Sequence, residues 1–458
     1  MNPSSPRDGA LPAPETLGLP FAAVVLLLFV SSALRMPATF LDPAFWAEDC
    51  TVFFHDSVEV GSAAILAPLY GSHHLLPRLI VHLASFFPTF WGPVLYSVAA
   101  GVLSSVSLGL FSRAGFRWLV PDDRLRLLLC WLFSLCPGTT ESFFALCTVN
   151  YALFCGLLFL LLERDAEGRW QMGIRRALLM SFLWISVGQA VVLAAPLAYL
   201  YWLTRKGSYL LCLGTLAAAV LLNATSANEF RPQTLPGFGS LALIYIENLA
   251  ARLAFIPVVP HRYIDIVRRM GSAPFLVLAA SLLGGYVWAV FKARRLDRQG
   301  ARVLAIAALS AMALFPLTVL ARDYGLPVLS RWQVYLGGRA ALVPSVLALV
   351  LLWLWLARPV RGALPRAAAA GLLALTTYCV LFEPFYVPPG RLRQSVWEWP
   401  VQAVIIDTAL RARREGTLRE AVVLGDIRCR PHDPFWKVKK LTIAPRGGSP
   451  SAPPPPLR

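Results

Sequence analysis

Charged residues are scarce in this chain. Asp, Glu, Lys and Arg make up 15% of its 458 residues, against about a quarter in a typical soluble domain. Hydrophobic residues make up 57%, and the mean hydropathy is +0.61. A soluble core does not need that much apolar surface, so the composition excludes an ordinary soluble domain and predicts that lipid surrounds most of the chain.

Acidic residues are scarcer than basic ones, 25 against 42, which gives a formal net charge of +17. In a soluble protein this excess would suggest nucleic acid. Here the basic residues form short clusters between apolar runs, and no basic stripe alternates with exposed aromatic residues. This pattern is typical of cytoplasmic loops that face anionic membrane lipid, and we expect no nucleic-acid partner.

Metal-ligand spacings such as CxxC are absent among the eight cysteines. Six of them lie in or beside apolar runs and are expected to be small core residues: Cys130, Cys136, Cys147, Cys155, Cys212 and Cys379. Cys50 and Cys429 fall in segments that we place outside the membrane. A disulfide between these two is one alternative if that compartment is oxidising, and two free thiols are the other.

Long charge-poor runs are abundant. The first, from Thr16 to Leu34, has no small-residue cleavage site after it and predicts a retained first span instead of a removed signal peptide. Further runs lie near 89–111, 127–140, 142–162, 177–186, 189–203, 208–224, 272–291, 303–320, 340–357 and 367–382. Because runs in lipid must be helical, we expect an all-α polytopic integral membrane protein with about eleven membrane-embedded helices.

Five basic clusters predict the orientation, since such clusters stay in the cytoplasm. They are Arg113, Arg117, Arg124 and Arg126; Arg164, Arg169, Arg175 and Arg176; Arg205 and Lys206; Lys292, Arg294, Arg295 and Arg298; and Arg358, Arg361 and Arg366. We therefore expect a cytoplasmic arm (1–16), a transmembrane domain (17–384) and a short outer tail (385–458). The tail contains a helix at 401–414, a strand at 421–425 and a disordered end.

Two stretches, 127–162 and 177–204, have cytoplasmic clusters on both sides and are too short for two spans of ~20 residues each. We expect each to be a hairpin of short or broken helices. The hairpin tips, Pro137 to Glu141 and Ser186 to Gln189, then point outward at partial membrane depth. The outer loops are expected at about 36–78, 225–271 and 321–339, with an interfacial or re-entrant helix at 240–258.

The first outer loop holds an acidic pair, Glu48 and Asp49, among aromatic residues. Two neighbouring carboxylates that are partly desolvated hold a proton more readily than one in water, as a general base or a metal ligand requires. In the alternative interpretation, Glu48 caps a short interfacial helix and Asp49 faces water.

Further along this loop, the stretch APLYGSHHLLPRLIVHLASFFP carries His73, His74 and Arg78. On a helix, His74 and Arg78 share a face because they are four residues apart. Arg78 there could hold a phosphate through a charge-assisted fork, or could extend to lipid headgroups. The two histidines beside the acidic pair leave a divalent metal as an open alternative.

Other polar residues fall where the membrane disfavours them. Glu141 lies at the tip of the first hairpin, and an ionisable group at that depth is a functional hypothesis by default. The third outer loop carries Arg322, Asp323, Arg331 and Arg339, against the positive-inside rule. These basic residues predict an anion such as a lipid-linked phosphate, or pairing with Asp323 and headgroups.

Together these features resemble the GT-C superfamily of polytopic membrane glycosyltransferases, and also uncharacterised bacterial membrane proteins with WAEDG-like motifs. The resemblance rests on the acidic pair, the PLYGSHHLLPRLI stretch, the paired short helices and the LGGRAALVP segment. It departs from the pattern at Cys50, where Gly is usual, and at Ala340 and Ala341, where aromatic residues are usual.

The resemblance implies an enzyme of the bacterial inner (cytoplasmic) membrane. Such an enzyme moves a sugar from a polyprenyl-phosphate donor to an envelope glycolipid, polysaccharide or protein on the extracytoplasmic face. Glu48 and Asp49 would be catalytic, and His73, His74, Arg78, Glu141, Arg322, Asp323, Arg331 and Arg339 would bind substrate. The alternatives are a transporter or flippase of lipid-linked saccharide and a non-catalytic protein of envelope assembly.

Overall fold

The computed structural model describes most of the first half of the chain and parts of the second. The described residues are 19–41, 45, 49–69, 72–136, 143–165, 167–225, 273–281, 284, 298–321, 346, 349–350, 371, 374, 398–428 and 437–445. Within them the chain is mostly helical, as predicted, and the strands form two short antiparallel hairpins. The stretch 240–258, the third outer loop and most of the last two apolar runs lie outside these residues.

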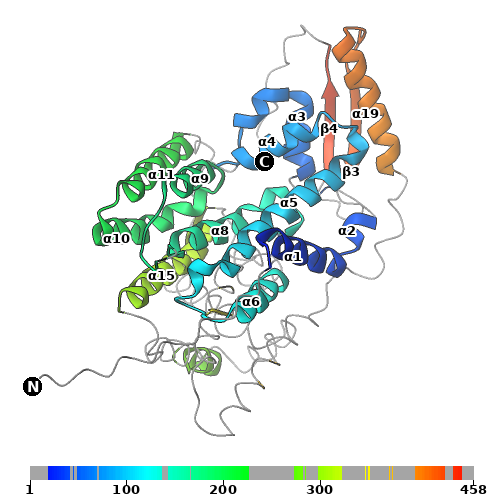
Figure 1. Cartoon of the computed structure of the whole chain (residues 1–458). Coiled ribbons are helices and arrows are strands. Elements are labelled where there is room, and N and C mark those ends of the chain that lie inside the picture. The colour runs from blue at the N-terminus through cyan, green and yellow to red at the C-terminus, as the bar shows by residue number, and fades with distance from the viewer. Residues whose placement is uncertain are drawn as a thin grey trace, which may run out of the picture.

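Apolar runs predicted from the sequence form helices (Figure 1). The helices that match whole runs are α1 (Phe21–Arg35), α5 (Gly92–Gly109), α11 (Gly207–Thr225) and α15 (Arg298–Ala321). In the described part of the chain, two helical stretches are long and apolar enough to cross a membrane, Thr89–Ser112 and Gly207–Ala224. Length and composition indicate membrane association for these two, and the larger number of spans stays a prediction.

The two predicted hairpins consist of short helices. The first contains α6 (Asp123–Leu135) and α8 (Asn150–Leu162), each of 13 residues. The second contains α9 (Ile174–Ser186), also of 13 residues, and α10 (Ala194–Thr204), of 11, with the 3₁₀ turn η7 (Gly188–Leu193) between them. Thirteen residues extend about 20 Å, less than the ~30 Å of a hydrocarbon core. The prediction of short, broken helices is therefore confirmed.

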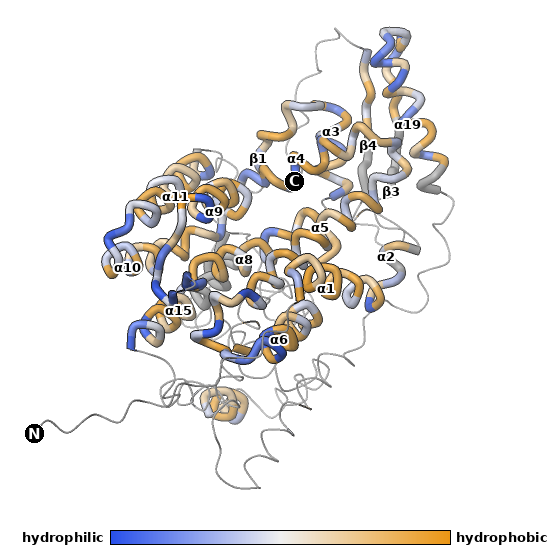
Figure 2. Tube along the Cα trace, viewed as in Figure 1, coloured by the Kyte–Doolittle hydropathy of each residue, from blue (hydrophilic) through white to orange (hydrophobic). Residues whose placement is uncertain are grey.

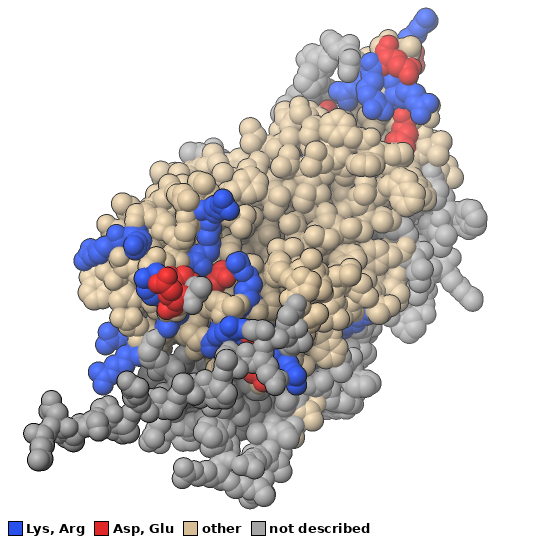
Figure 3. Space-filling model, in the orientation of Figure 1, with Lys and Arg blue, Asp and Glu red and all other residues tan. Residues whose placement is uncertain are grey.

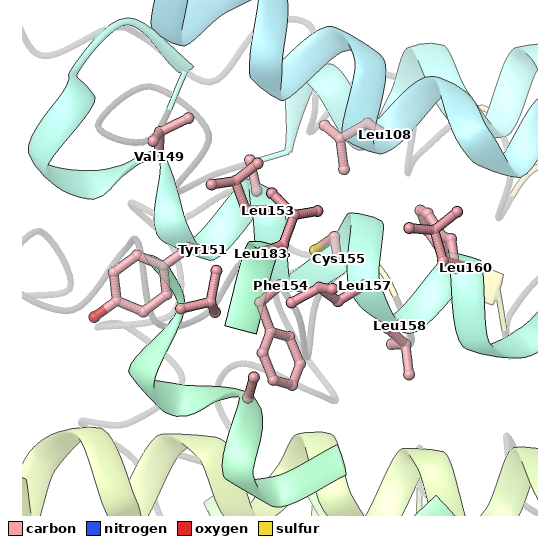
Figure 4. Close-up of a cluster of buried hydrophobic side chains, with 14 of the residues drawn as sticks. Leu108, Val149, Tyr151, Leu153, Phe154, Cys155, Leu157, Leu158, Leu160 and Leu183 are labelled. Carbon is pink, nitrogen blue, oxygen red and sulfur yellow. The ribbon is translucent and has the colours of Figure 1, made fainter. Parts of the chain in front are cut away.

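Helix α8 forms the centre of the hydrophobic core. All 13 of its residues are buried, among them Leu153, Phe154 and Leu158 (Figure 4). A helix that is apolar on every side has no face to turn toward water, so it is surrounded by other helices. Phe159 of α8 contacts Phe133 of α6, with ring centroids 6.0 Å apart.

Small residues let α5 and α8 approach each other closely. A Cβ added to Gly156 of α8 would lie 3.0 Å from the Cβ and 3.3 Å from the Cα of Ser107 of α5. Backbone atoms cannot move aside as the end of a flexible side chain can. Small residues at such contacts are typical of helix pairs in membranes.

We expect Gly156→Leu to lower the free energy of unfolding by about 1–3 kcal/mol, because the new side chain would force α5 and α8 apart. Thermal unfolding of the detergent-solubilised protein measures this loss. Gly214→Leu in α11 is the matched control, since a Cβ there meets no atom within 4 Å. Equal melting temperatures for the two variants would contradict the close contact.

Charged side chains on the face shown in Figure 3 gather toward two ends of the molecule, with a broad uncharged area between them. Figure 2 shows the helices of this middle part as mostly hydrophobic. Some of their large apolar side chains are exposed, such as Leu34, at 75%, and Leu221, at 68%. Soluble monomers rarely expose apolar patches of this extent.

One charged end contains the first two predicted cytoplasmic clusters, which contact each other directly. Glu163 forms ion pairs with Arg113 (3.1 Å) and with Arg176 (3.2 Å). The guanidinium of Arg164 lies 4.7 Å and 4.4 Å from the ring centroids of Trp118 and Trp170. These contacts agree with the prediction that both clusters lie on the same side.

The opposite end contains the C-terminal segment. It consists of α19 (Glu398–Glu415) and a hairpin of β3 (Val422–Arg428) and β4 (Lys437–Ile443). The helix predicted at 401–414 and the strand predicted at 421–425 are thereby confirmed. Both Oδ atoms of Asp407 in α19 accept from the backbone N–H of Thr89, each at 3.0 Å. Helix α19 of the tail is therefore in contact with the helical part through Thr89.

Candidate functional site

The predicted first outer loop folds into short helices and one small strand pair beside the C-terminal segment (Figure 1). Its elements are α2 (Ala38–Leu41), the π-helical turn η1 (Asp49–Phe54), α3 (His55–Glu59), η2 (Gly61–Leu66), β1 (Pro68–Leu69), β2 (Ser72–His73) and α4 (Leu75–Ala84). Elements η1 and α3 follow each other without a break. Single π-helical turns are frequent at functional sites, because they change which side chains share a face.

Asp49 opens this helical segment and is 1% exposed. Its Oδ2 accepts a hydrogen bond from the backbone N–H of Leu146 (3.0 Å), and its Oδ1 accepts from Cys147 (2.7 Å). These two amides begin the 3₁₀ turn η6 (Leu146–Thr148), which leads into α8. The interpretation in which Asp49 faces water is therefore wrong. Glu48 lies outside the described residues.

Arg78 of α4 is 2% exposed, so it does not extend to lipid headgroups. Its Nη1 forms an ion pair with Oδ2 of Asp56 at 3.0 Å, and its guanidinium lies 5.1 Å from the ring centroid of Phe53. Within the described part of the chain, neither Nε nor Nη2 of this side chain has a hydrogen-bond acceptor. Burial lowers the pKa of Arg78, and the ion pair with Asp56 opposes this shift. The guanidinium remains charged, because its ordinary pKa is far above neutrality.

His74 lies in the same cluster. Its ring centroid is 5.8 Å from that of Phe53, and its carbonyl oxygen accepts from the backbone N–H of Arg78 at 2.9 Å. The prediction that His74 and Arg78 share a face is therefore confirmed. His73 ends strand β2, where its backbone N–H donates to Oδ1 of Asn223 in α11 at 2.9 Å.

The break in the second hairpin lies against this cluster. Oγ of Ser186 accepts from the backbone N–H of Leu76 at 2.8 Å. A Cβ added to Gly188 would lie 2.6 Å from Oγ of Ser72. Oε1 of Gln189 accepts from Nδ2 of Asn150, the first residue of α8, at 3.3 Å. Predicted tip residues of this hairpin thus contact the stretch that carries His73, His74 and Arg78.

Cys50 follows Asp49 and is fully buried and disulfide-bonded. Its partner lies outside the described residues, as do Cys379 and Cys429, so the pairing of Cys50 with Cys429 stays a prediction. The other described cysteines are buried, which confirms the core prediction for Cys130, Cys136, Cys147, Cys155 and Cys212.

Sequence reasoning missed Asp56, the ion-pair partner of Arg78. The signal was its place in the aromatic FFHDS stretch, where a lone carboxylate needs a cation. The other predicted site residues lie outside the described part of the chain: Glu141, Arg322, Asp323, Arg331 and Arg339. Among the described residues, no group of three His, Cys, Asp or Glu side chains is placed to hold a metal ion.

No protein-family model, no curated protein and no solved structure matches this chain.

Proposed function

We propose that this chain is a membrane glycosyltransferase that moves a sugar from a polyprenyl-phosphate donor to an envelope glycan, glycolipid or protein. The observation that carries the proposal is the buried guanidinium of Arg78, in which two donor nitrogens, Nε and Nη2, have no acceptor among the residues that the structure describes. A buried donor without a partner costs free energy. A phosphate oxygen would remove that cost through charge-assisted hydrogen bonds.

The position of Arg78 supports an extracytoplasmic site. Lys and Arg gather at both ends of the face shown in Figure 3. The clusters between predicted spans, which Glu163 joins through Arg113 and Arg176, are the ones that we place in the cytoplasm, because basic loops between spans stay there. By this argument the N-terminus is inside, the C-terminus is outside, and Arg78 lies near the outer surface. A donor whose phosphate leaves the outer leaflet would reach it there.

In the proposed reaction a carboxylate of the acidic pair removes the proton of an acceptor hydroxyl. The hydroxyl oxygen then bonds to the anomeric carbon while the bond from that carbon to the donor phosphate oxygen breaks. The bonding electrons leave with the polyprenyl phosphate, and Arg78 stabilises its charge. Since both oxygens of Asp49 already accept backbone N–H groups, we assign Asp49 a positioning role and Glu48 the role of the base.

A transporter or flippase of lipid-linked saccharide is the second candidate, because broken helices are also common in transporters. It is less well supported, because the described cluster lies at one end of the molecule and not at its middle. Reconstituted vesicles loaded with a polyprenyl-phosphate sugar separate the two. Release of polyprenyl phosphate supports transfer, and crossing of the intact donor supports transport.

We expect Arg78→Gln to weaken the binding of farnesyl phosphate, a short isoprenyl phosphate, by about 10- to 150-fold. This range corresponds to the ~1.5–3 kcal/mol of a hydrogen bond to a charged group. Calorimetric titration in detergent measures the dissociation constant. Arg78→Lys should be intermediate, because it keeps the charge and loses the planar fork.

Arg169 is exposed and belongs to the second predicted cytoplasmic cluster, so Arg169→Gln is the control variant. Farnesol is the control ligand. The proposal fails if farnesol binds the unmodified protein as tightly as farnesyl phosphate does. It also fails if Arg78→Gln binds farnesyl phosphate with unchanged affinity.

A further inference from the structure

A series of polar contacts leads from the C-terminal hairpin to Arg78. The backbone N–H of Thr442 in β4 donates to Oε1 of Glu59 at 2.9 Å, and the same oxygen lies 3.3 Å from Nε2 of His55. Nδ1 of His55 lies 3.6 Å from Oδ1 of Asp56. Oδ2 of Asp56 forms the ion pair with Arg78 at 3.0 Å. Both oxygens of Asp56 therefore face a partner, one on each side.

Helix α3 places three of these side chains within five residues. His55 and Glu59 are four residues apart and share a face, so the imidazole reaches the carboxylate. His55, Asp56 and Glu59 are each roughly a fifth to a quarter exposed. A carboxylate with a partner for each oxygen loses less rotamer freedom when a ligand binds, which is the benefit of preorganisation.

Helix α19, which precedes the hairpin that supplies Thr442, also contacts the first outer loop and the turn before α5. Nη1 of Arg413 in α19 donates to the carbonyl oxygen of Val58 at 3.0 Å. Asp407, six residues before Arg413 in α19, also accepts from Oγ1 of Thr89 at 2.6 Å. The backbone of Val58, next to Glu59, is held by Arg413, and the Glu59 side chain is held by Thr442. The position of Glu59 therefore depends on the C-terminal segment.

We propose that Asp56, His55 and Glu59 are positioning residues that orient the Arg78 guanidinium for a phosphate group. On this proposal the β3–β4 hairpin is part of the anion site, although Thr442 touches Glu59 and not Arg78. The inference rests on the proposed function of Arg78 as the phosphate ligand. It adds to that function a series of polar contacts through which the β3–β4 hairpin and helix α3, more than 350 residues apart in the sequence, form one site.

The test compares His55→Gln and Glu59→Gln with Glu415→Gln, an exposed carboxylate on α19. Gln at position 59 still accepts from Thr442, so the hairpin stays docked while the charge that faces His55 is lost. We expect each of the first two variants to weaken farnesyl phosphate binding by roughly 3- to 10-fold, and Glu415→Gln to leave it unchanged. Melting temperatures identify any variant that fails to fold.

A positioning role also predicts coupling to Arg78. In an Arg78→Gln background, His55→Gln and Glu59→Gln should change the dissociation constant by less than about 2-fold, because no guanidinium remains to be oriented. Equal losses in both backgrounds would mean a general structural effect and would overturn the inference.

The inference fails alone if Arg78→Gln weakens binding while His55→Gln and Glu59→Gln do not. The proposed function fails with it if Arg78→Gln has no effect. Inorganic phosphate is a second probe, which should raise the melting temperature of the unmodified protein more than that of either variant. Absence of any effect of both probes would overturn both proposals.

Discussion

Replacing Glu48 by Ala is expected to lower the rate of sugar transfer by about 10²- to 10⁴-fold, the usual contribution of a general base. The acceptor hydroxyl would keep its proton and attack the anomeric carbon poorly. The base acts on the acceptor hydroxyl during the chemical step and does not hold the donor. The loss should therefore appear in kcat and not in the affinity for the donor. Release of polyprenyl phosphate from a polyprenyl-phosphate sugar in reconstituted vesicles measures the rate.

Two comparisons make this result specific to Glu48. Glu48→Gln should be as slow as Glu48→Ala, because an amide cannot take the proton, and Glu415→Ala should transfer at the unmodified rate. Normal membrane levels and an unchanged melting temperature exclude misfolding. If neither Glu48→Ala nor Asp49→Ala slows transfer at normal protein levels, the acidic pair is not catalytic.

Asp49→Ala is expected to act on stability, with a loss of about 2–5 kcal/mol in the free energy of unfolding. The substitution removes the acceptor of two buried backbone amides, those of Leu146 and Cys147. Each amide left without a partner costs about 1–3 kcal/mol. Because these amides begin the turn before α8, the loss should reach the hydrophobic core. Thermal unfolding in detergent measures it.

Asp49→Asn should lose less stability than Asp49→Ala, because one oxygen remains while the amide nitrogen faces an N–H donor. Glu167→Ala is the control for loss of a surface carboxylate. Glu167 is 66% exposed, and its ion pair with Arg169 contributes little in water. An Asp49→Ala protein that melts with the Glu167→Ala control would contradict the structural role of Asp49.

The helices were predictable because their signal is local. An uncharged run such as the one in α11 predicts a helix by length and composition, and the local pattern likewise predicted the helix at 401–414 and the strand at 421–425. The short hairpin helices followed from the spacing of basic clusters along the chain. Glu163 pairs with one arginine from each of the first two clusters, Arg113 and Arg176, so these two clusters lie together, while the side of the membrane stays a prediction.

The partners within the candidate site were not predictable, because they are distant in the sequence. Asp49 meets Cys147 98 residues later, and Glu59 meets Thr442 383 residues later. The aromatic residues near Asp49 favoured partial desolvation, but they left a carboxylate that faces water as an alternative, because its partners lie far along the chain. The sequence predicted that Arg78 could hold a phosphate, yet only the tertiary structure shows that Asp56 of α3 pairs with Nη1 of its guanidinium.

The sequence by itself determined the apolar character of the chain, its mostly helical fold and the segregation of its charges, since each depends on composition and on neighbours along the chain. Tertiary structure alone decided which polar groups are buried and which find partners. It showed that Asp49 is buried and accepts from two backbone amides, left two guanidinium nitrogens of Arg78 without an acceptor among the described residues, and brought the C-terminal hairpin into contact with Glu59 of the first loop. The physical reason is that the desolvation of a charge depends on the whole of its surroundings, which come from segments far apart in the chain.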